Sequence, residues 1–172
     1  MNLDQLDNGS YVAPDDPGEP GTGRPRISIT ERESQLLAFL AANKRVLEIG
    51  TGLGISTDRL ACHALEVWTV DIDPWVHANV FPALHKDVKC FTDRDQIPES
   101  EVFDVVFIDG RHTVVDTHVD IEYAQSRCPR GIIVVHDAGL PEVYEALTYE
   151  FGADWAMVET THGIAVMFVG WE

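Results

Sequence analysis

The sequence predicts an α/β fold with a doubly wound, mostly parallel β-sheet. Between residues 46 and 135, short apolar segments rich in β-branched residues alternate with segments whose apolar residues recur at helical spacing. Two further apolar segments, 155–158 and 164–169, are joined by a short link that ends in glycine, which predicts an antiparallel hairpin. The length of 172 residues is typical of one domain with a sizeable core.

The first part of the chain, residues 1–26, differs in composition from the rest. It is acidic and rich in Pro and Gly, so it cannot bury enough apolar surface to offset the entropy of ordering it. We therefore expect a flexible arm followed by a folded domain over residues 27–172. A lid that orders over a bound ligand, using Tyr11, is the functional alternative.

The first helix is predicted by a T-x-x-E capping box that runs from Thr30 to Glu33. An apolar face with helical spacing follows it, formed by Leu36, Leu37, Phe39 and Leu40. The helix is expected to end near Asn43 and to pack on the sheet beside a ligand cleft.

Three glycines at alternate positions, Gly50, Gly52 and Gly54, follow the first strand at residues 46–49 and precede a helical segment. Glycines permit positive φ and let a ligand approach bare backbone, and the start of a helix favours an anionic group. The third glycine comes one residue earlier than in the dinucleotide fingerprint G-x-G-x-x-G. The pattern indicates a nucleotide-type cofactor, and a generic strand-to-helix turn is the alternative.

The second strand, residues 67–70, ends at Asp71, which lies 21 positions after Gly50. A carboxylate at this place can accept hydrogen bonds from both hydroxyls of a ribose. Asp73 precedes Pro74 and is expected to cap the next helix.

Three motifs together resemble the class I S-adenosylmethionine-dependent methyltransferases: VLEIGTGLGIST at 46–57, FDVVFIDGRHT at 103–113 and RGIIVVHD at 130–137. The last two resemble most closely the catechol-type O-methyltransferases and a related group of small bacterial methyltransferases with D-G-x-H and H-D motifs. The resemblance implies a Rossmann-like, seven-stranded sheet of order 3-2-1-4-5-7-6. Arg111 departs from the Asp or Asn usual in that group, and it either holds an acidic acceptor or lies on the surface.

The resemblance also implies how S-adenosyl-L-methionine is bound. The glycine turn accommodates its methionine half, Glu48 reaches the ammonium group, and Ser56 reaches the carboxylate. Asp71 holds the ribose, Ile72 lies against the adenine, and Asp93 accepts from the adenine amino group, unless Asp93 is a solvated loop residue. The implied cofactor-binding residues are Glu48, Gly50, Gly52, Gly54, Ser56, Asp71, Ile72 and Asp93.

Asp109, His136 and Asp137 follow the fourth and fifth strands, which are neighbours in such a sheet, so their side chains should converge at one rim. Two carboxylates and an imidazole can hold Mg²⁺ or another divalent cation, as the corresponding residues of catechol-type enzymes do. The match is partial, because those enzymes have a carboxylate at His136 and an amide at Asp137. The non-functional alternative is that Asp109 caps a helix and His136 pairs with Asp137 or the backbone. In an enzyme without a metal, His112 or His136 becomes the general base.

The expected function is a methyltransferase that acts on a small-molecule acceptor, with O-methylation as the expected reaction. Two other classes stay open: a non-catalytic S-adenosylmethionine-binding module or partner subunit, and an NAD-dependent oxidoreductase, which the glycine spacing disfavours. The net charge of −17 opposes nucleic acid as a partner.

Composition indicates where the protein is located and in what state its cysteines are. No apolar run approaches the ~20 residues needed to span a bilayer and no leader is visible, so we expect a cytoplasmic location without membrane association. Three scattered cysteines, Cys62, Cys90 and Cys128, are expected to be buried free thiols. A homodimer stays open, and the sequence does not decide it.

Overall fold

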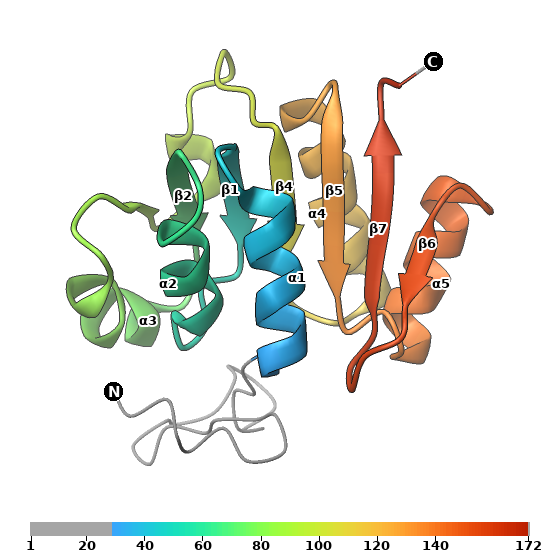
Figure 1. Cartoon of the computed structure of the whole chain (residues 1–172), viewed down its shortest axis with the longest axis horizontal. Coiled ribbons are helices and arrows are strands. Elements are labelled where there is room, and N and C mark those ends of the chain that lie inside the picture. The colour runs from blue at the N-terminus through green and yellow to red at the C-terminus, as the bar shows by residue number, and fades with distance from the viewer. Residues whose placement is uncertain (1–28, 172) are drawn as a thin grey trace.

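The computed structural model describes residues 29–171, and the expected arm with Tyr11 lies outside this part of the chain. A seven-stranded sheet runs in the order β3-β2-β1-β4-β5-β7-β6, which confirms the predicted fold class and strand order (Figure 1). The strands from β3 to β5 pair in parallel, and β7 pairs antiparallel with both β5 and β6. The strands are β1 (Arg45–Ile49), β2 (Glu66–Val70), β3 (Lys89–Phe91), β4 (Val105–Ile108), β5 (Gly131–His136), β6 (Ala156–Val158) and β7 (Ile164–Val169).

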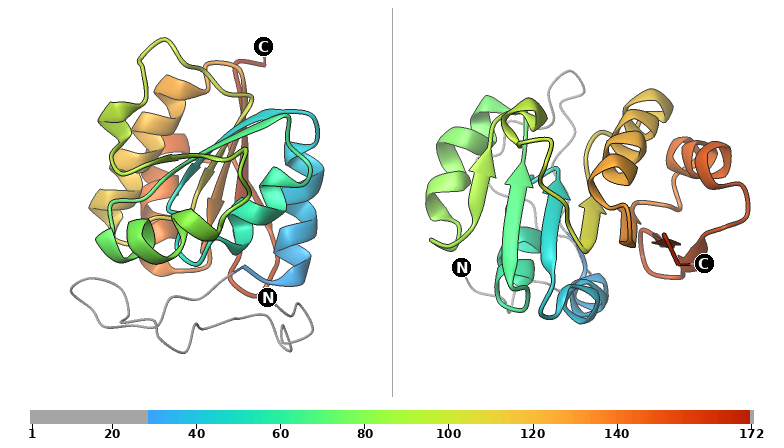
Figure 2. Two further views of the ribbon diagram at one scale, coloured as in Figure 1. Left: turned by 90° about the vertical axis from the view of Figure 1, so that its left-hand side faces the viewer. Right: turned by 90° about the horizontal axis from the view of Figure 1, so that it is seen from above.

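Helices cover both faces of the sheet. In the view from above, α1 and α2 lie on one side of the strands, and α4 and α5 lie on the other (Figure 2). Among the described residues, every helix is too short or too polar to cross a membrane. The helices are α1 (Glu31–Ala41), α2 (Ile55–Ala61), α3 (Pro74–Asn79), α4 (Val114–Arg127) and α5 (Pro141–Phe151), with the 3₁₀ turns η2 (Phe81–Ala83) and η3 (Arg94–Gln96).

The core is split by the sheet into two apolar layers, because successive strand residues point to opposite faces. In β1, Val46 packs with α1 and α2, whereas Leu47 packs with α4 and α5. Phe107 of β4 belongs to the first layer and Ile108 to the second, and both are buried. Burial on both faces explains why these strands read as continuous apolar runs.

The predicted capping box starts α1. The Thr30 hydroxyl accepts a hydrogen bond from the Glu33 amide at 3.3 Å, and Glu33 Oε2 accepts one from the Thr30 amide at 2.7 Å. The expected apolar face is wrong at one position, because Phe39 is exposed. Leu37 and Ala41 form the buried side of the helix instead.

Helix α4 exposes two apolar residues, Val115 and Val119. Its buried face includes polar side chains that are paired inside the protein. Asp120 lies 3.1 Å from Arg94, and Arg127 donates to the Pro98 carbonyl at 2.9 Å. Pairing of this kind lets charged groups occupy buried positions.

The three cysteines are free thiols in the structure. Cys128 is buried as expected, Cys90 is half-buried, and Cys62 is exposed, so the prediction of burial is wrong for Cys62. Cys62 is the residue that immediately follows α2, where the chain turns at the surface.

Candidate functional site

The glycine turn after β1 adopts a backbone that other residues rarely adopt. Gly50, Gly52 and Gly54 have φ values of +93°, +52° and +78°. A Cβ atom on Gly50 would lie 2.1 Å from the carbonyl oxygen of Asp109, so the end of β4 passes directly against this glycine. A Cβ on Gly52 would meet no atom within 4 Å. The turn is therefore packed at Gly50 and open at Gly52.

Asp71 ties the end of β2 to this turn. Its Oδ2 atom accepts hydrogen bonds from the Thr51 and Gly52 amides, each at 3.0 Å, and its Oδ1 atom accepts from the Asp73 amide at 2.8 Å. Backbone N–H groups that converge on one carboxylate fix the position of both partners. The Asp73 side chain caps α3 by accepting from Trp75, as the sequence predicts.

A small hollow opens beside the turn at the carboxyl ends of β1 and β4. Its wall includes the side chain of Asp109 and the first residues of α2. Gly52 and Asp109 both line this hollow, and Asp71 is tied to the turn through the Gly52 amide. The strand ends are joined by hydrogen bonds from the Gly50 amide to the Val70 carbonyl and from the Asp109 amide to the Ile49 carbonyl, each 2.8 Å long. The hollow is lined by Ile29, Thr51, Gly52, Leu53, Ile55, Ser56 and Asp109.

Glu48 is fully buried beneath the turn, and it bonds to Ser56. Its carboxylate accepts from three hydroxyls: Ser56 at 2.6 Å, Thr57 at 2.5 Å and Thr69 at 2.6 Å. Burial raises the pKa of Glu48 to about 7, although the three hydroxyl donors lower it. In this arrangement Glu48 holds the first turn of α2 against β1 and β2.

The two residues expected near an adenine ring lie on the surface. Ile72 is 61 % exposed, although its side chain is large and apolar. Asp93 is exposed and caps η3 by accepting from the Asp95 amide at 2.9 Å. The Asp71 amide donates to Phe91 at 3.1 Å, which keeps the ends of β2 and β3 side by side.

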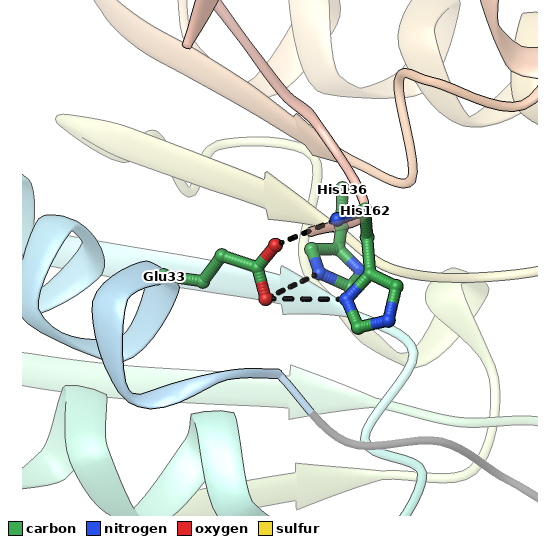
Figure 3. Close-up of side chains that lie close together, drawn as sticks. All are labelled: Glu33, His136 and His162. Carbon is green, nitrogen blue, oxygen red and sulfur yellow. Dashed lines mark hydrogen bonds and ion pairs between the residues drawn. The ribbon is translucent and has the colours of Figure 1, made fainter. Parts of the chain in front are cut away.

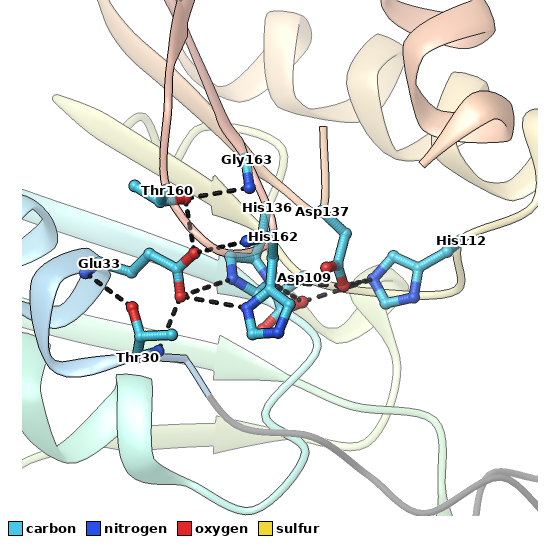
Figure 4. A network of polar contacts seen from close by, with 9 residues as sticks. All are labelled: Thr30, Glu33, Asp109, His112, His136, Asp137, Thr160, His162 and Gly163. Carbon is cyan, nitrogen blue, oxygen red and sulfur yellow. Dashed lines mark hydrogen bonds and ion pairs between the residues drawn. The ribbon is translucent and has the colours of Figure 1, made fainter. Parts of the chain in front are cut away.

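The side chains of Asp109, His112, His136 and Asp137 come together at the ends of β4 and β5, and we call these four residues the outer cluster (Figure 4). His136 Nδ1 lies 3.1 Å from Asp109 Oδ1 and 3.4 Å from Asp137 Oδ2. His112 Nε2 lies 3.1 Å from Asp137 Oδ2 and 3.5 Å from Asp109 Oδ1. The structure thus brings together every residue that the sequence nominates for catalysis or metal binding.

Electrostatics within the outer cluster favour the charged forms. Burial raises the pKa of Asp109, but the imidazoles of His136 and His112 outweigh it and hold this pKa well below its usual range. Burial lowers the pKa of His136, but Asp109, Asp137 and Glu33 raise it well above the ordinary value. The pKa of His112 is raised in the same way, mainly by Asp109 against burial. Without a bound cation, His136 is therefore cationic at neutral pH, and the protonated form of His112 is favoured.

Backbone geometry places Asp137 in the outer cluster. Asp137 has a φ of +55°, which is uncommon for a residue with a side chain. The residues after it are held to the β6–β7 link, because the Ala138 amide donates to Gly163 at 3.1 Å and the Gly139 amide donates to His162 at 3.0 Å. This link therefore supports the end of β5.

Two residues beside the cluster were missed by the sequence reasoning. Glu33 was predicted only as a cap, and His162 had no predicted role. Glu33 Oε2 lies 3.3 Å from both His136 Nε2 and His162 Nδ1 (Figure 3). No local pattern could have found this group, because Glu33 and His162 are 129 positions apart. Arg111, by contrast, is exposed beside the outer cluster.

Neither a protein-family model nor a curated protein sequence matches the chain. Solved structures do match its fold. A tRNA (m1A58) methyltransferase from Aquifex aeolicus superposes with a TM-score of 0.67 and 21% identity, over 81% of this chain and 68% of that one. A SAM-dependent O-methyltransferase from Thermotoga maritima gives 0.66 and 13%, over 84% and 67%.

A third match includes a product-like ligand. The N-methyltransferase NodS from Bradyrhizobium japonicum WM9, in complex with S-adenosyl-L-homocysteine, gives a TM-score of 0.61 and 18% identity, over 81% of this chain and 87% of that one. The chain therefore has the fold of class I S-adenosylmethionine-dependent methyltransferases. Proteins with this fold methylate different classes of acceptor, so the acceptor must be argued from the site.

Proposed function

We propose that the chain is an S-adenosylmethionine-dependent methyltransferase that methylates a hydroxyl of a small-molecule acceptor. The observation that carries the proposal is a hollow lined by Gly52 and Asp109, with Asp71 bonded to the Gly52 amide, in a fold shared with an enzyme whose structure contains S-adenosylhomocysteine. The open face of Gly52 leaves room for the methionine half of the cofactor. We assign the ribose to Asp71, which follows β2, and the adenine to Ile72 and Asp93, whose exposed positions leave them accessible to a ligand.

The acceptor is proposed to bind next to the outer cluster. Transfer is an in-line displacement at the sulfonium methyl, so the enzyme must hold a deprotonated oxygen on the methyl axis. His112 is the better candidate for contact with an acceptor, because its side chain is 26% exposed and that of His136 only 2%. The net charge of −17 favours a small acceptor over nucleic acid.

The outer cluster fits a hard divalent cation such as Mg²⁺. The proposed ligands Asp109, His136 and Asp137 offer donor atoms that lie within 4.8 Å of one another. Such a cation would lower the pKa of the acceptor hydroxyl. Added positive charge would also lower the pKa of His112 and so favour the neutral form, which a general base requires.

Calorimetric titration tests the cofactor. S-Adenosylmethionine should release heat on binding, and NAD should not. Asp71→Asn should weaken S-adenosylmethionine binding by at least about tenfold, because an amide accepts ribose hydroxyls less strongly than a carboxylate does. Asp87→Asn is the matched control, since Asp87 is exposed and precedes β3 rather than following a strand. Binding of NAD alone would overturn the proposal.

Methyl transfer to a catechol, with and without Mg²⁺, tests the chemistry. Activity should depend on the ion and should fall at least about tenfold in Asp137→Asn. Cofactor binding without transfer to any hydroxyl compound would favour the non-catalytic module instead.

A further inference from the structure

His136 has a second face that the outer cluster does not use. Its Nδ1 atom points to Asp109 and Asp137, whereas its Nε2 atom points away from them, toward Glu33 on α1 (Figure 4). His162, on the link between β6 and β7, reaches the same carboxylate (Figure 3). We call Glu33, His136 and His162 the inner cluster.

The spacing of the inner cluster matches the edge of a metal tetrahedron. Glu33 Oε2 lies 3.3 Å from His136 Nε2 and 3.3 Å from His162 Nδ1. Zinc bonds of about 2.0–2.1 Å place neighbouring tetrahedral ligands about 3.3–3.4 Å apart. All three donor atoms lie within 4.8 Å of one another. One ion between them would therefore need little movement of the side chains.

The burial of His136 Nε2 is a second observation, independent of the spacing, that points to a bound ligand. The residue is 2% exposed, and this nitrogen is a buried polar atom that makes no hydrogen bond. The Glu33 carboxylate is near enough for an ion pair, but it is not aligned as a hydrogen-bond acceptor for this nitrogen. Buried polar atoms are nearly always satisfied, so an unsatisfied ring nitrogen aimed at a carboxylate and a second imidazole points to a ligand.

The surroundings of the inner cluster orient its donors as a metal site requires. His136 Nδ1 hydrogen-bonds to Asp109 Oδ1 at 3.1 Å, which is the carboxylate–histidine arrangement found behind zinc ligands. Glu33 Oε1 accepts from the Thr160 hydroxyl at 2.6 Å, and Oε2 accepts from the Thr30 amide at 2.7 Å while it also faces the two imidazoles. His162 is the most accessible of the three, with a side chain that is 18% exposed.

We propose that Glu33, His136 and His162 bind one Zn²⁺ ion, with an open coordination position on the side of His162. Two imidazoles and a carboxylate suit zinc better than Mg²⁺, which prefers oxygen ligands. The ion joins α1, the end of β5 and the β6–β7 link. It also fixes the proton of His136 on Nδ1, where it is donated to Asp109.

The two clusters share one imidazole, and this limits how they are used. A neutral imidazole has a single lone pair, so His136 serves either the inner ion or a cation beside Asp109. With zinc in the inner cluster, a cation in the outer cluster is held by Asp109 and Asp137 alone. The inner site does not depend on the proposed methyl transfer, because its three proposed ligands, Glu33, His136 and His162, do not line the hollow beside the glycine turn.

Titration of Zn²⁺ into the chelator-treated protein tests the site. Calorimetry should show one equivalent in the wild type, and Co²⁺ in its place should give the intense visible bands of four-coordinate cobalt. His162→Ala and Glu33→Gln should each weaken Zn²⁺ binding by at least about tenfold. His63→Ala is the matched control, because it removes an exposed histidine far along the chain from the cluster and should change nothing.

A further variant separates the two clusters. Asp137→Asn removes a ligand of the outer cluster and should weaken Zn²⁺ binding much less than His162→Ala does, because Asp137 contacts His136 only at Nδ1 and is not a proposed zinc ligand. Loss of binding in Asp137→Asn, with unchanged binding in His162→Ala, would overturn the proposal, as would an unchanged affinity in His162→Ala alone. Circular dichroism shows whether each variant is folded, and His162→Ala decides the outcome if Glu33→Gln unfolds. S-Adenosylmethionine binding, measured on the same samples, reports separately on the proposed function.

Discussion

The two halves of the sheet's carboxyl rim are built by different means. Around β1 and β2, backbone groups define the shape, through the glycine turn and the amides of Thr51 and Gly52 that bind Asp71. Around β4 and β5, ionisable side chains define it, because His136 lies between the carboxylates of Asp109 and Glu33. Substitutions in the first half should therefore act through sterics, and those in the second half through charge and pH.

The contrast fits the proposed division of labour. The cofactor does not vary between reaction cycles, so it can be bound by fixed backbone donors and by glycines that leave the backbone accessible. Activation of an acceptor instead requires groups that change their protonation state, and these must be ionisable side chains. Asp109 belongs to both halves, since its carbonyl packs against Gly50 and its carboxylate meets His136.

Gly50→Ala should have the largest effect. The added Cβ would lie 2.1 Å from the backbone oxygen of Asp109, and the φ of +93° is strained for alanine. We expect a loss of about 5 kcal/mol in the free energy of unfolding, measured by urea denaturation. Gly52→Ala is the control for φ alone, because no atom lies within 4 Å of its Cβ, and it should lose about 1 kcal/mol. Equal losses in both variants would contradict the steric account.

Glu33→Gln should be the next largest, because it removes a buried charge that faces the cationic His136. We expect a loss of about 3 kcal/mol or more at pH 6. Glu31→Gln is the control on the same helix, since Glu31 pairs with Arg59 at the surface and should change stability by less than about 0.5 kcal/mol.

The pH dependence of the Glu33 effect follows from the pKa shifts. The pKa of Glu33 is lowered: burial raises it, but the ion pair with His136 and the hydrogen bonds from the Thr160 hydroxyl and the Thr30 amide outweigh burial, so its stabilisation is present above its ordinary value of 4.5 and is lost as pH falls. The pKa of His136 is raised, so its stabilisation is complete below 6.5 and is lost as pH rises through the folded-state value. The difference between wild type and Glu33→Gln should therefore be largest between about pH 4.5 and 6.5. A difference that does not vary with pH would contradict the ion pair.

The order of the strands and most of the outer cluster could be predicted because both depend on neighbouring strands. Asp109 and His136 directly follow strand segments that pair in register, with Ile108 opposite Val135, so residues at these ends must meet. The glycine turn was predictable for a similar reason, since its spacing is local. Which side of a helix is buried could not be predicted from apolar residues alone. Val115 and Val119 of α4 are apolar yet exposed, because Asp120 and Arg127 on the other side of the helix have partners inside the protein.

The inner cluster could not be predicted, because it depends on where α1 and the β6–β7 link lie over the sheet. The capping box explains why a glutamate stands at position 33, and it gives no reason for a second role. In the structure Glu33 performs both: Oε2 accepts from the Thr30 amide at 2.7 Å and also faces His136 and His162. Only the tertiary packing reveals that the carboxylate of Glu33 also faces two histidines.

The pH response of Glu48 is the smallest of these effects. It tests whether pH sensitivity extends into the half of the rim around β1 and β2. Burial raises its pKa from 4.5 to about 7, so the folded state binds more protons than the unfolded state between these values, and stability falls as pH rises. At 1.36 kcal/mol per pKa unit, this single group removes roughly 2.5 kcal/mol between pH 5 and 8. Glu48→Gln should flatten the profile of unfolding free energy against pH by about that amount.

Glu66→Gln is the control for this profile. Glu66 is paired with Lys89 and Arg45, and its pKa is lowered to about 2, chiefly by the hydrogen bond from Lys89, so its contribution changes only below pH 4.5. Its variant should keep the wild-type slope between pH 5 and 8. If Glu48→Gln also keeps that slope, the three hydroxyl donors offset burial completely. Glu48 would then be an ordinary ionised carboxylate, and pH sensitivity would be confined to the β4 and β5 half of the rim.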